Sequence, residues 1–188
     1  MKTIKASREN IEGIITALKN GAVLVLPTDT VYGLVCDAAN ESAVGKIFEI
    51  KKRDKTKPLA VFVKDIDQAK EFAEISAEQE KFLQKNWPGA VTVILKAKGG
   101  LSKLVYKNNT IGMRLPNYEL LNLILDDFGE PLAQTSANIS GEGDPVEISK
   151  IKSQFENQDI LIVEAGDLPK RKASAIIDLS KEEIKILR

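Results

Sequence analysis

The sequence contains no histidine, and Cys36 is its only cysteine. Without histidine, a Ser/His or Cys/His nucleophile pair is excluded, and a zinc site loses its usual ligands. A single cysteine permits no internal disulfide, which fits a reducing compartment, and we expect Cys36 to be a buried thiol without a chemical role. Any chemistry of this protein must therefore use other groups.

Long apolar runs and net charge are also absent. No segment approaches the roughly 20 apolar residues of a membrane span, and residues 1–15 lack the apolar core of a signal peptide, so we expect a cytoplasmic protein without membrane contact. The 27 basic and 27 acidic residues cancel, which excludes a general polyanion-binding field. Walker-type, GxGxxG and GxSxG motifs are missing as well. A nucleotide or anion site must therefore be local and of a less common kind.

The 188 residues, 43% of them hydrophobic, suit one compact domain spanning 1–188. Expected strands and helices interleave incompletely, and several strands follow one another directly. This pattern predicts an α/β fold with a mixed twisted sheet flanked by helices. The expected strands are 22–26, 59–63, 90–95, 110–115, 131–135, 160–163, 175–179 and 184–187. The expected helices are 11–18, 43–50, 118–128 and 147–157, with one or two more within 65–86.

The segment KKRDKTK, residues 51–57, contains five basic residues and ends before Pro58. Lys51 and Arg53 are two positions apart, which directs side chains apart on a helix but to the same side of an extended chain. Because Pro58 stops a regular helix, the segment should leave helical geometry and let these cations converge on an anion such as phosphate. Alternatively, they only complement the negative end of a helix, and the segment alone does not decide.

Two polar loops follow expected strands, and ligands of open sheets bind beyond strand ends. In PTDTVYGL, residues 27–34, Thr28 and Thr30 offer two hydroxyls to a ligand or satisfy their own backbone in a turn. In TSANISG, residues 135–141, small hydroxyl and amide groups suit ribose or phosphate, although such loops are also plain connections. Arg114 lies between apolar residues of GMRLP and requires a carboxylate partner from the protein or from a substrate.

Seven segments, taken in order, resemble one family. They are PTDTVYGL, KKR followed by KPL, WPGAVTVIL, GMRLPN, TSANISG, SAIIDLS and the terminal ILR, and they span residues 26–188. This pattern is similar to that of the YrdC/TsaC family, the threonylcarbamoyl-AMP synthases. The resemblance implies a YrdC-like α/β fold with a deep, positively charged cavity. It also implies a nucleotidyltransferase that condenses L-threonine, bicarbonate and ATP into threonylcarbamoyl-adenylate and pyrophosphate, usually with Mg²⁺.

The resemblance further implies partners in tRNA processing. Downstream proteins would transfer the threonylcarbamoyl group to tRNA, forming threonylcarbamoyladenosine, and weak tRNA binding would accompany this. The main alternative is an RNA-binding or ribosome-maturation module that uses the same basic cavity, extended by Lys170–Lys172. Neutral net charge and sparse aromatic residues count against it. A related enzyme with another carbamoyl donor or amino acid is a second alternative.

Site residues are also implied by position. Lys51 and Arg53 match the family's KxR cations and are expected to be catalytic, holding the ATP phosphates and the bicarbonate-derived group. The residues expected to bind L-threonine are Thr30, Arg114 and Ser174, with Arg114 on the carboxylate. Besides the two cations, the residues expected to contact the nucleotide are Thr110, Ser136, Asn138 and Arg188. Metal ligands are not assigned, and residues 142–146 are expected to close the cavity.

Overall fold

The structure is a computed structural model that describes residues 1–143, 145–181 and 183–188. Its strands are β1 Lys2–Lys5, β2 Leu24–Leu26, β3 Gly33–Asp37, β4 Ala60–Phe62, β5 Ala73–Glu74, β6 Val91–Ala97, β7 Tyr106–Lys107, β8 Thr110–Arg114, β9 Leu132–Ser136, β10 Leu161–Glu164, β11 Ala175–Asp178 and β12 Lys185–Ile186. Its helices are α1 Ile11–Lys19, α2 Glu41–Lys51, α3 Ile66–Phe72, α4 Ala77–Asn86, α5 Glu119–Phe128 and α6 Ile148–Gln154, with short 3₁₀ helices at Arg8–Asn10 and Lys103–Val105. Among these described helices, none is long and apolar enough to cross a membrane.

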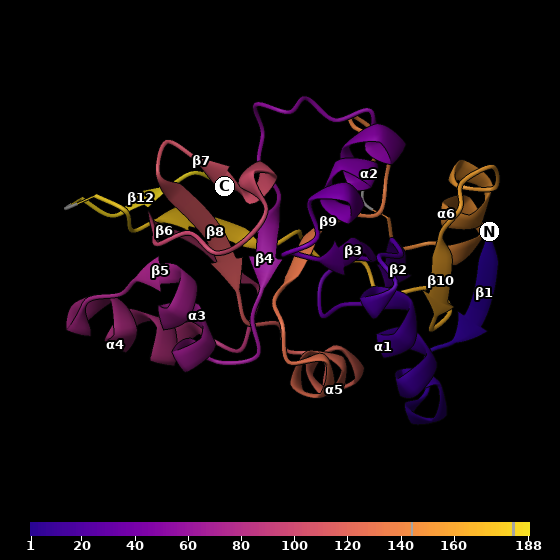
Figure 1. The fold of residues 1–188 in the computed structure, drawn as a ribbon, viewed down its shortest axis with the longest axis horizontal. Coiled ribbons are helices and arrows are strands. Elements are labelled where there is room, and N and C mark those ends of the chain that lie inside the picture. Colours follow the sequence, from indigo (N-terminus) through magenta and orange to yellow (C-terminus); the bar gives the residue numbers. More distant parts are fainter. Residues whose placement is uncertain (144, 182) are drawn as a thin grey trace.

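The strands form one mixed sheet in the order β1-β10-β2-β3-β9-β4-β8-β6-β11-β12, with β5 beside β6 and β7 beside β8 (Figure 1). The sheet contains both parallel pairs, such as β4 with β8, and antiparallel pairs, such as β3 with β9. The expected mixed twisted sheet flanked by helices is therefore confirmed.

Four strands were not expected from the sequence: β1, β3 and the two-residue strands β5 and β7. β3 starts at Gly33, inside the PTDTVYGL segment that was interpreted only as a polar loop or turn. It pairs with β2 and β9, so it lies at the centre of the sheet. β1 is a short polar segment that pairs with β10 at one edge. The expected helical region 65–86 divides into α3 and α4, because Ser76 starts the second helix with a capping box.

The register of the central strands separates the two faces of the sheet. Cys36, Ala133, Val61, Met113 and Val93 align from strand to strand and belong to one buried cluster with residues of α2, α3 and α4. Because side chains alternate along a strand, the neighbouring residues point to the opposite face. Cys36 is fully buried, so the expectation of a buried thiol is confirmed. Burial also raises the pKa of the thiol, which disfavours the reactive thiolate.

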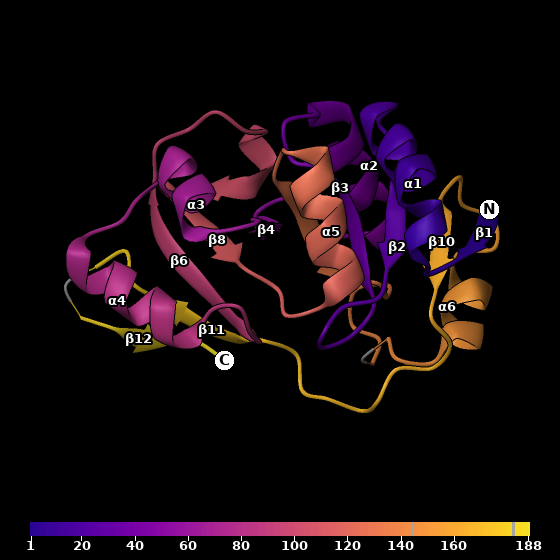
Figure 2. The same ribbon diagram turned by 90° about the horizontal axis from the view of Figure 1, so that it is seen from below.

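The opposite face is covered over only part of its area. α1 and α5 lie side by side there and pack in a second cluster with Val35, Phe62 and Leu132 (Figure 2). Beyond these helices the face continues as a row of half-buried residues, Gln134, Ala60, Gly112 and Ile94. We call these four residues the uncovered row. It borders the cavity described below.

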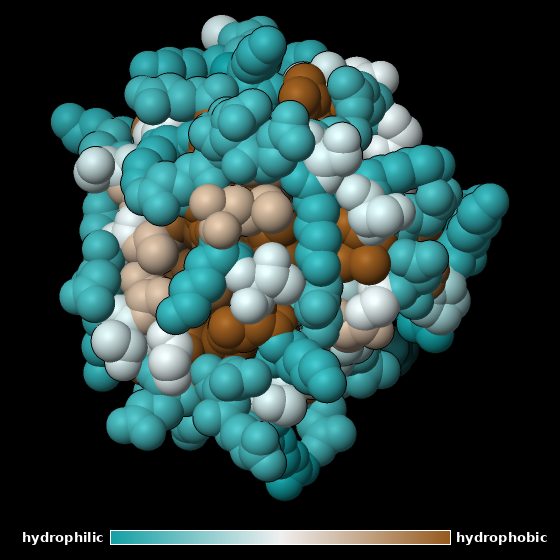
Figure 3. Space-filling view, turned by 90° about the vertical axis from the view of Figure 1, so that its right-hand side faces the viewer, coloured by the Kyte–Doolittle hydropathy of each residue, from teal (hydrophilic) through white to brown (hydrophobic). Residues whose placement is uncertain are grey.

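The edge strand β1 lies at the end of the molecule seen in Figure 3. That view shows mostly hydrophilic side chains around a smaller apolar area. Lys2 and Lys5, at the two ends of β1, are exposed. A short edge strand with lysines resists pairing with another chain.

The N-terminus of α2 offers a test of how the helix that ends at Lys51 is held. The Asn40 side-chain oxygen accepts a hydrogen bond from the Ala43 amide at 3.0 Å. Replacing Asn40 with alanine should lower the free energy of unfolding by about 1 kcal/mol, because one amide loses its cap. Urea unfolding measures this, with Asn157→Ala as the matched control because Asn157 is exposed. Equal losses in both variants would contradict the assigned cap.

Candidate functional site

A cavity of about 220 Å³ opens where the β2–β3 connection, the α2–β4 connection and strands β8, β9 and β11 meet. The side chains of Arg53, Arg114 and Arg188 line it. Among the described lining residues there is no aspartate or glutamate. The cavity therefore concentrates positive charge in a protein whose net charge is zero.

Arg114 is 3% exposed and has partners on three sides. Its Nη2 lies 2.6 Å from Asp29 Oδ1, its Nη1 donates to Thr30 Oγ1 at 3.2 Å, and its Nε donates to the Gly89 carbonyl at 2.9 Å. The guanidinium also lies over the Phe62 ring, 5.8 Å from its centroid. Burial lowers the pKa of Arg114, Asp29 opposes that shift, and nearby Arg188 adds to it. The required carboxylate is therefore Asp29 of this protein.

The PTDTVYGL segment turns sharply enough for its hydroxyls to meet. Thr28 Oγ1 donates to the Val31 carbonyl at 2.7 Å and accepts from the Thr30 amide at 3.0 Å. The two hydroxyls are 3.1 Å apart, and both residues line the cavity. The turn interpretation is confirmed for Thr28, which satisfies its local backbone. Thr30 places its hydroxyl beside Arg114 at the cavity, and its contact with a ligand stays a prediction.

The end of α2 determines where the basic segment points. Lys52 adopts left-handed backbone geometry with φ of 52°, and the Lys52 and Arg53 amides donate to the Glu49 and Phe48 carbonyls. This Schellman-type end turns the chain out of the helix immediately after Lys51. Arg53 then reaches the cavity, where its guanidinium donates to the carbonyls of Lys57 and Pro58. Burial lowers the pKa of Arg53.

Lys51 points elsewhere. Its Nζ donates to the carbonyls of Ser136 and Asn138 at 2.7 and 2.6 Å and to Asn138 Oδ1 at 2.9 Å. These three acceptors match the three hydrogens of an ammonium group. Lys51 is 2% exposed, and burial together with the nearby Arg53 lowers its pKa to about 8. In this conformation Lys51 is hydrogen-bonded to residues 135–138, which we call the TSAN loop, and it does not line the cavity.

Asn138 extends this network away from the cavity. Its Oδ1 also accepts from Ser136 Oγ at 2.6 Å, and its Nδ2 donates to the carbonyls of Glu142 and Gly143. The expected closing segment, residues 142–146, is thus attached to the TSAN loop at its start. Asp144 within it lies outside the described residues.

The C-terminal strands complete the wall. Ser174 Oγ lies 2.9 Å from Thr92 Oγ1, and the Ser174 carbonyl accepts from Arg188 Nε at 3.1 Å. The backbone of β12 pairs with β11, and the Ile176 amide donates to the Arg188 carbonyl. The pairing holds Arg188 at the cavity.

Six of the residues assigned from the resemblance line this cavity: Thr30, Arg53, Arg114, Ser136, Ser174 and Arg188. Lys51 and Asn138 lie behind Ser136, joined to it by hydrogen bonds. Thr110 does not line the cavity, and its hydroxyl donates to the Lys107 carbonyl at 2.7 Å. The structure thus brings eight of these residues into one neighbourhood and leaves Thr110 at the far end of β8.

Sequence reasoning missed several residues of the site. Asp29 stands in the middle of a quoted motif, but its pairing with Arg114 joins residues 85 positions apart. Thr92 and Gln134 line the cavity from β6 and β9. Thr92 was detectable in principle, because it is the one polar residue in the run AVTVIL.

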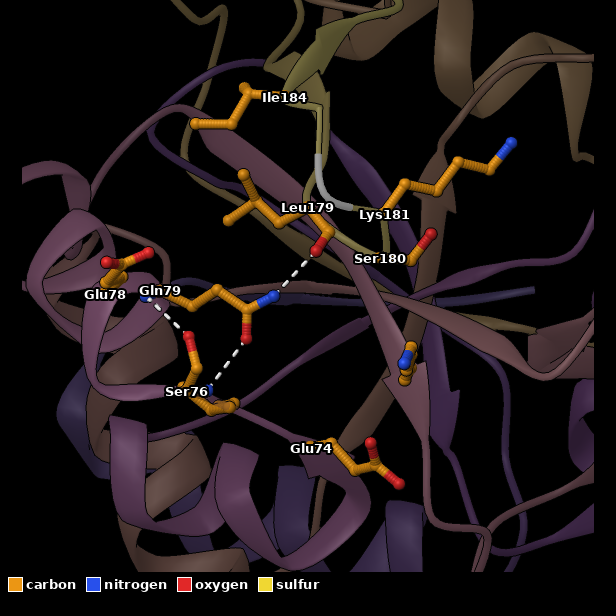
Figure 4. A pocket seen from close by; sticks show the side chains of 10 residues that line it. Glu74, Ser76, Glu78, Gln79, Leu179, Ser180, Lys181 and Ile184 are labelled. Atoms are coloured by element: carbon orange, nitrogen blue, oxygen red, sulfur yellow. Dashed lines mark hydrogen bonds between the residues drawn. The ribbon is translucent and has the colours of Figure 1, made fainter.

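A larger hollow, about 660 Å³, lies between the start of α4 and the β11–β12 hairpin. Figure 4 shows Gln79 completing the capping box with Ser76 and donating to the Leu179 carbonyl, so these polar groups serve the fold. Its acids and lysines, such as Glu74 and Lys181, do not converge on one point in Figure 4. The smaller cavity is therefore the candidate site.

The residues of the cavity do not form a magnesium cage. Mg²⁺ binds carboxylate oxygens together with substrate phosphates and water. The described lining residues supply no carboxylate, and no group of three or more Asp, Glu, Cys or His residues within the described chain is arranged for a metal ion. The described lining therefore supplies three arginines and no carboxylate ligand for a metal.

The sequence model of the Sua5/YciO/YrdC family, described as "Telomere recombination", matches residues 16–188. The chain belongs to this family. A threonylcarbamoyl-AMP synthase of Vibrio vulnificus is 32% identical over 181 residues, which cover 93% of this chain and 96% of that protein.

Solved structures agree with the fold. Sua5 of P. abyssi complexed with L-threonine superposes with a TM-score of 0.91 at 28% identity, covering 100% of this chain and 56% of that one. This chain therefore spans little more than half of that relative. E. coli YciO superposes with a TM-score of 0.89 at 25% identity, covering 100% of this chain and 92% of that one.

The pKa of Lys51 gives a prediction for stability. An unfolded lysine has a pKa of about 10.4, so between about pH 8 and 10.4 the folded protein has lost a proton that the unfolded chain keeps. The contribution of Lys51 to the free energy of unfolding therefore rises with pH in this window, by about 1–2 kcal/mol from pH 8 to about pH 9.5.

Urea unfolding of wild type and Lys51→Met at these two pH values measures that contribution. Lys52→Met serves as the control, because Lys52 is the exposed neighbour. If the difference in the free energy of unfolding between wild type and Lys51→Met is the same at pH 8 and at about pH 9.5, the lowered pKa of Lys51 is contradicted.

Proposed function

We propose that this chain is a threonylcarbamoyl-AMP synthase that uses L-threonine, bicarbonate and ATP in the cytosol. The observation that carries the proposal is the convergence of Thr30, Arg114 and Ser174 with Arg53 and Arg188 in one cavity. The family relatives with that name, and the P. abyssi Sua5 complex with L-threonine, support it.

The threonine subsite lies at Arg114. An arginine has five N–H donors, and three atoms of Arg114 donate to Gly89, Thr30 and Asp29. One N–H on each Nη remains for a substrate carboxylate. The Thr30 and Ser174 hydroxyls lie at the same cavity and suit the substrate hydroxyl or amine.

The triphosphate subsite lies at Arg53 and Arg188. Both guanidinium groups hold backbone carbonyls with some of their donors and line the cavity. Mg²⁺ would enter bound to ATP and neutralise part of the phosphate charge. The uncovered row continues from the cavity with Ala60, which has only a methyl group, and Gly112, which has no side chain, and this leaves room for a flat base on the sheet. Ser136 faces the nucleotide and Asn138 supports Ser136 from behind. Thr110, which does not line the cavity, is given no contact with the nucleotide in this proposal.

The chemistry needs positioning more than a nucleophilic side chain. The amine of L-threonine and bicarbonate form a carbamate with loss of water. A carbamate oxygen then attacks the α-phosphorus of ATP, and the bond to the pyrophosphate oxygen breaks. Arg53 and Arg188 hold the charge of the leaving pyrophosphate. Lys51 contributes through the loop that it holds, and it contacts phosphate only after giving up one of its three acceptors.

The product would pass to proteins that transfer the threonylcarbamoyl group to tRNA, with weak tRNA binding by this chain. The rival RNA-binding module would use the same cations without releasing pyrophosphate. Affinity for RNA that falls steeply with salt, without turnover, would favour the rival.

Pyrophosphate release from ATP and Mg²⁺ should require both L-threonine and bicarbonate, with the adenylate product identified by mass. Arg53→Ala should lower this rate by roughly 100-fold or more, because a charged donor at the phosphates is lost. Lys55→Ala is the matched control, since Lys55 is exposed. Wild-type rates in Arg53→Ala, or release without L-threonine, would contradict the proposal.

A further inference from the structure

The three arginines of the cavity do not have equal electrostatic surroundings. Arg114 forms an ion pair with Asp29, and both side chains are buried, at 3% and 8% exposure. Arg53 and Arg188 donate instead to backbone carbonyls. Within residues 1–143, 145–181 and 183–188, no carboxylate lies within 4.0 Å of either.

Asp29 itself does not line the cavity. It lies behind Arg114, and its backbone carbonyl accepts from Arg171 at 3.0 Å. Its carboxylate therefore affects a ligand indirectly, by orienting Arg114 and by offsetting the positive charge of Arg114. A paired Arg114 presents two free N–H donors but little net charge to the cavity.

The cavity is thus divided by charge. In one part, formed by Arg114 with Asp29 and the Thr30 hydroxyl, the charge of the lining arginine is offset by a buried carboxylate. The other part, formed by Arg53 and Arg188, is cationic. L-threonine is a zwitterion of zero net charge, whereas ATP is a polyanion, so the two parts match the two substrates of the proposed function.

We propose that Asp29 is a positioning and specificity-determining residue that keeps the Arg114 subsite neutral, so that a zwitterionic amino acid enters it and phosphate-like anions do not. This inference rests on the proposed function. Without the charge of Asp29, Arg114 would attract simple anions, and these would occupy the place of the amino acid.

The test uses sulfate as the probe anion in the pyrophosphate-release assay. In wild type, sulfate should compete with ATP and not with L-threonine. In Asp29→Asn, where the amide oxygen can still accept from Arg114 but the charge is lost, sulfate should compete with L-threonine. At a sulfate concentration that leaves the apparent KM for L-threonine of wild type unchanged, the apparent KM of Asp29→Asn for L-threonine should rise by roughly tenfold or more.

Asp29→Glu is the conservative control, because it keeps the charge, and it should retain the wild-type inhibition pattern. A merely structural role for Asp29 would lower activity without changing which substrate sulfate competes with. If sulfate competes with ATP and not with L-threonine in Asp29→Asn, as in wild type, the inference is overturned.

A second measurement needs no variant and covers the case in which Asp29→Asn does not fold. Titration calorimetry on wild type should give an L-threonine affinity that changes less than about twofold between low and high salt, because a neutral ligand enters a neutral subsite. The affinity for ATP should fall with salt. A fall for L-threonine as steep as that for ATP would overturn the inference. Wild type that releases no pyrophosphate would instead count against the proposed function.

Discussion

The buried charge of Arg114 is the constraint on which the site depends. An uncompensated buried charge costs about 3–5 kcal/mol, a large share of the 5–15 kcal/mol that keeps a domain folded. The guanidinium is satisfied only if β8, the Asp29–Thr30 turn and the Gly89 carbonyl meet at one point, with Phe62 of β4 beneath. The same requirement that stabilises the charge therefore assembles the cavity wall from segments distant in the sequence.

Lys51 and Arg53 show how two cations of one motif acquire different tasks. The left-handed turn at Lys52 separates their directions, so that Lys51 finds three oxygen acceptors in the TSAN loop while Arg53 reaches the cavity. Three acceptors stabilise the protonated form of Lys51, whereas burial and Arg53 favour the neutral form. The loop that presents Ser136 is thus held by the Lys51 ammonium group, whose lowered pKa makes it easier to deprotonate than an ordinary lysine.

Much of this arrangement was predictable from the sequence. Helical spacing predicted α1, α2 and α5, short apolar runs predicted most strands, and a lone arginine in an apolar strand predicted a carboxylate partner. The partner's identity was not predictable, because Asp29 meets Arg114 through the placement of β3 at the centre of the sheet, and the sequence analysis did not expect a strand there. The direction of Lys51 depends on one left-handed residue, Lys52, which composition does not indicate. Thr110 is four residues from Arg114, and at about 3.3 Å per residue it lies beyond the cavity.

The absence of histidine fits a site of this kind. Adenylation of a carbamate requires two substrates to be held in line and the charge of the leaving group to be balanced, and neither task needs a side chain that titrates near pH 7. The group of the site whose pKa is lowered toward neutrality is Lys51, and its ammonium hydrogens are all directed at the TSAN loop. Loss of its proton would therefore act on the site by releasing one loop contact, and the pH response of such a site would reflect loop geometry more than proton transfer to substrate.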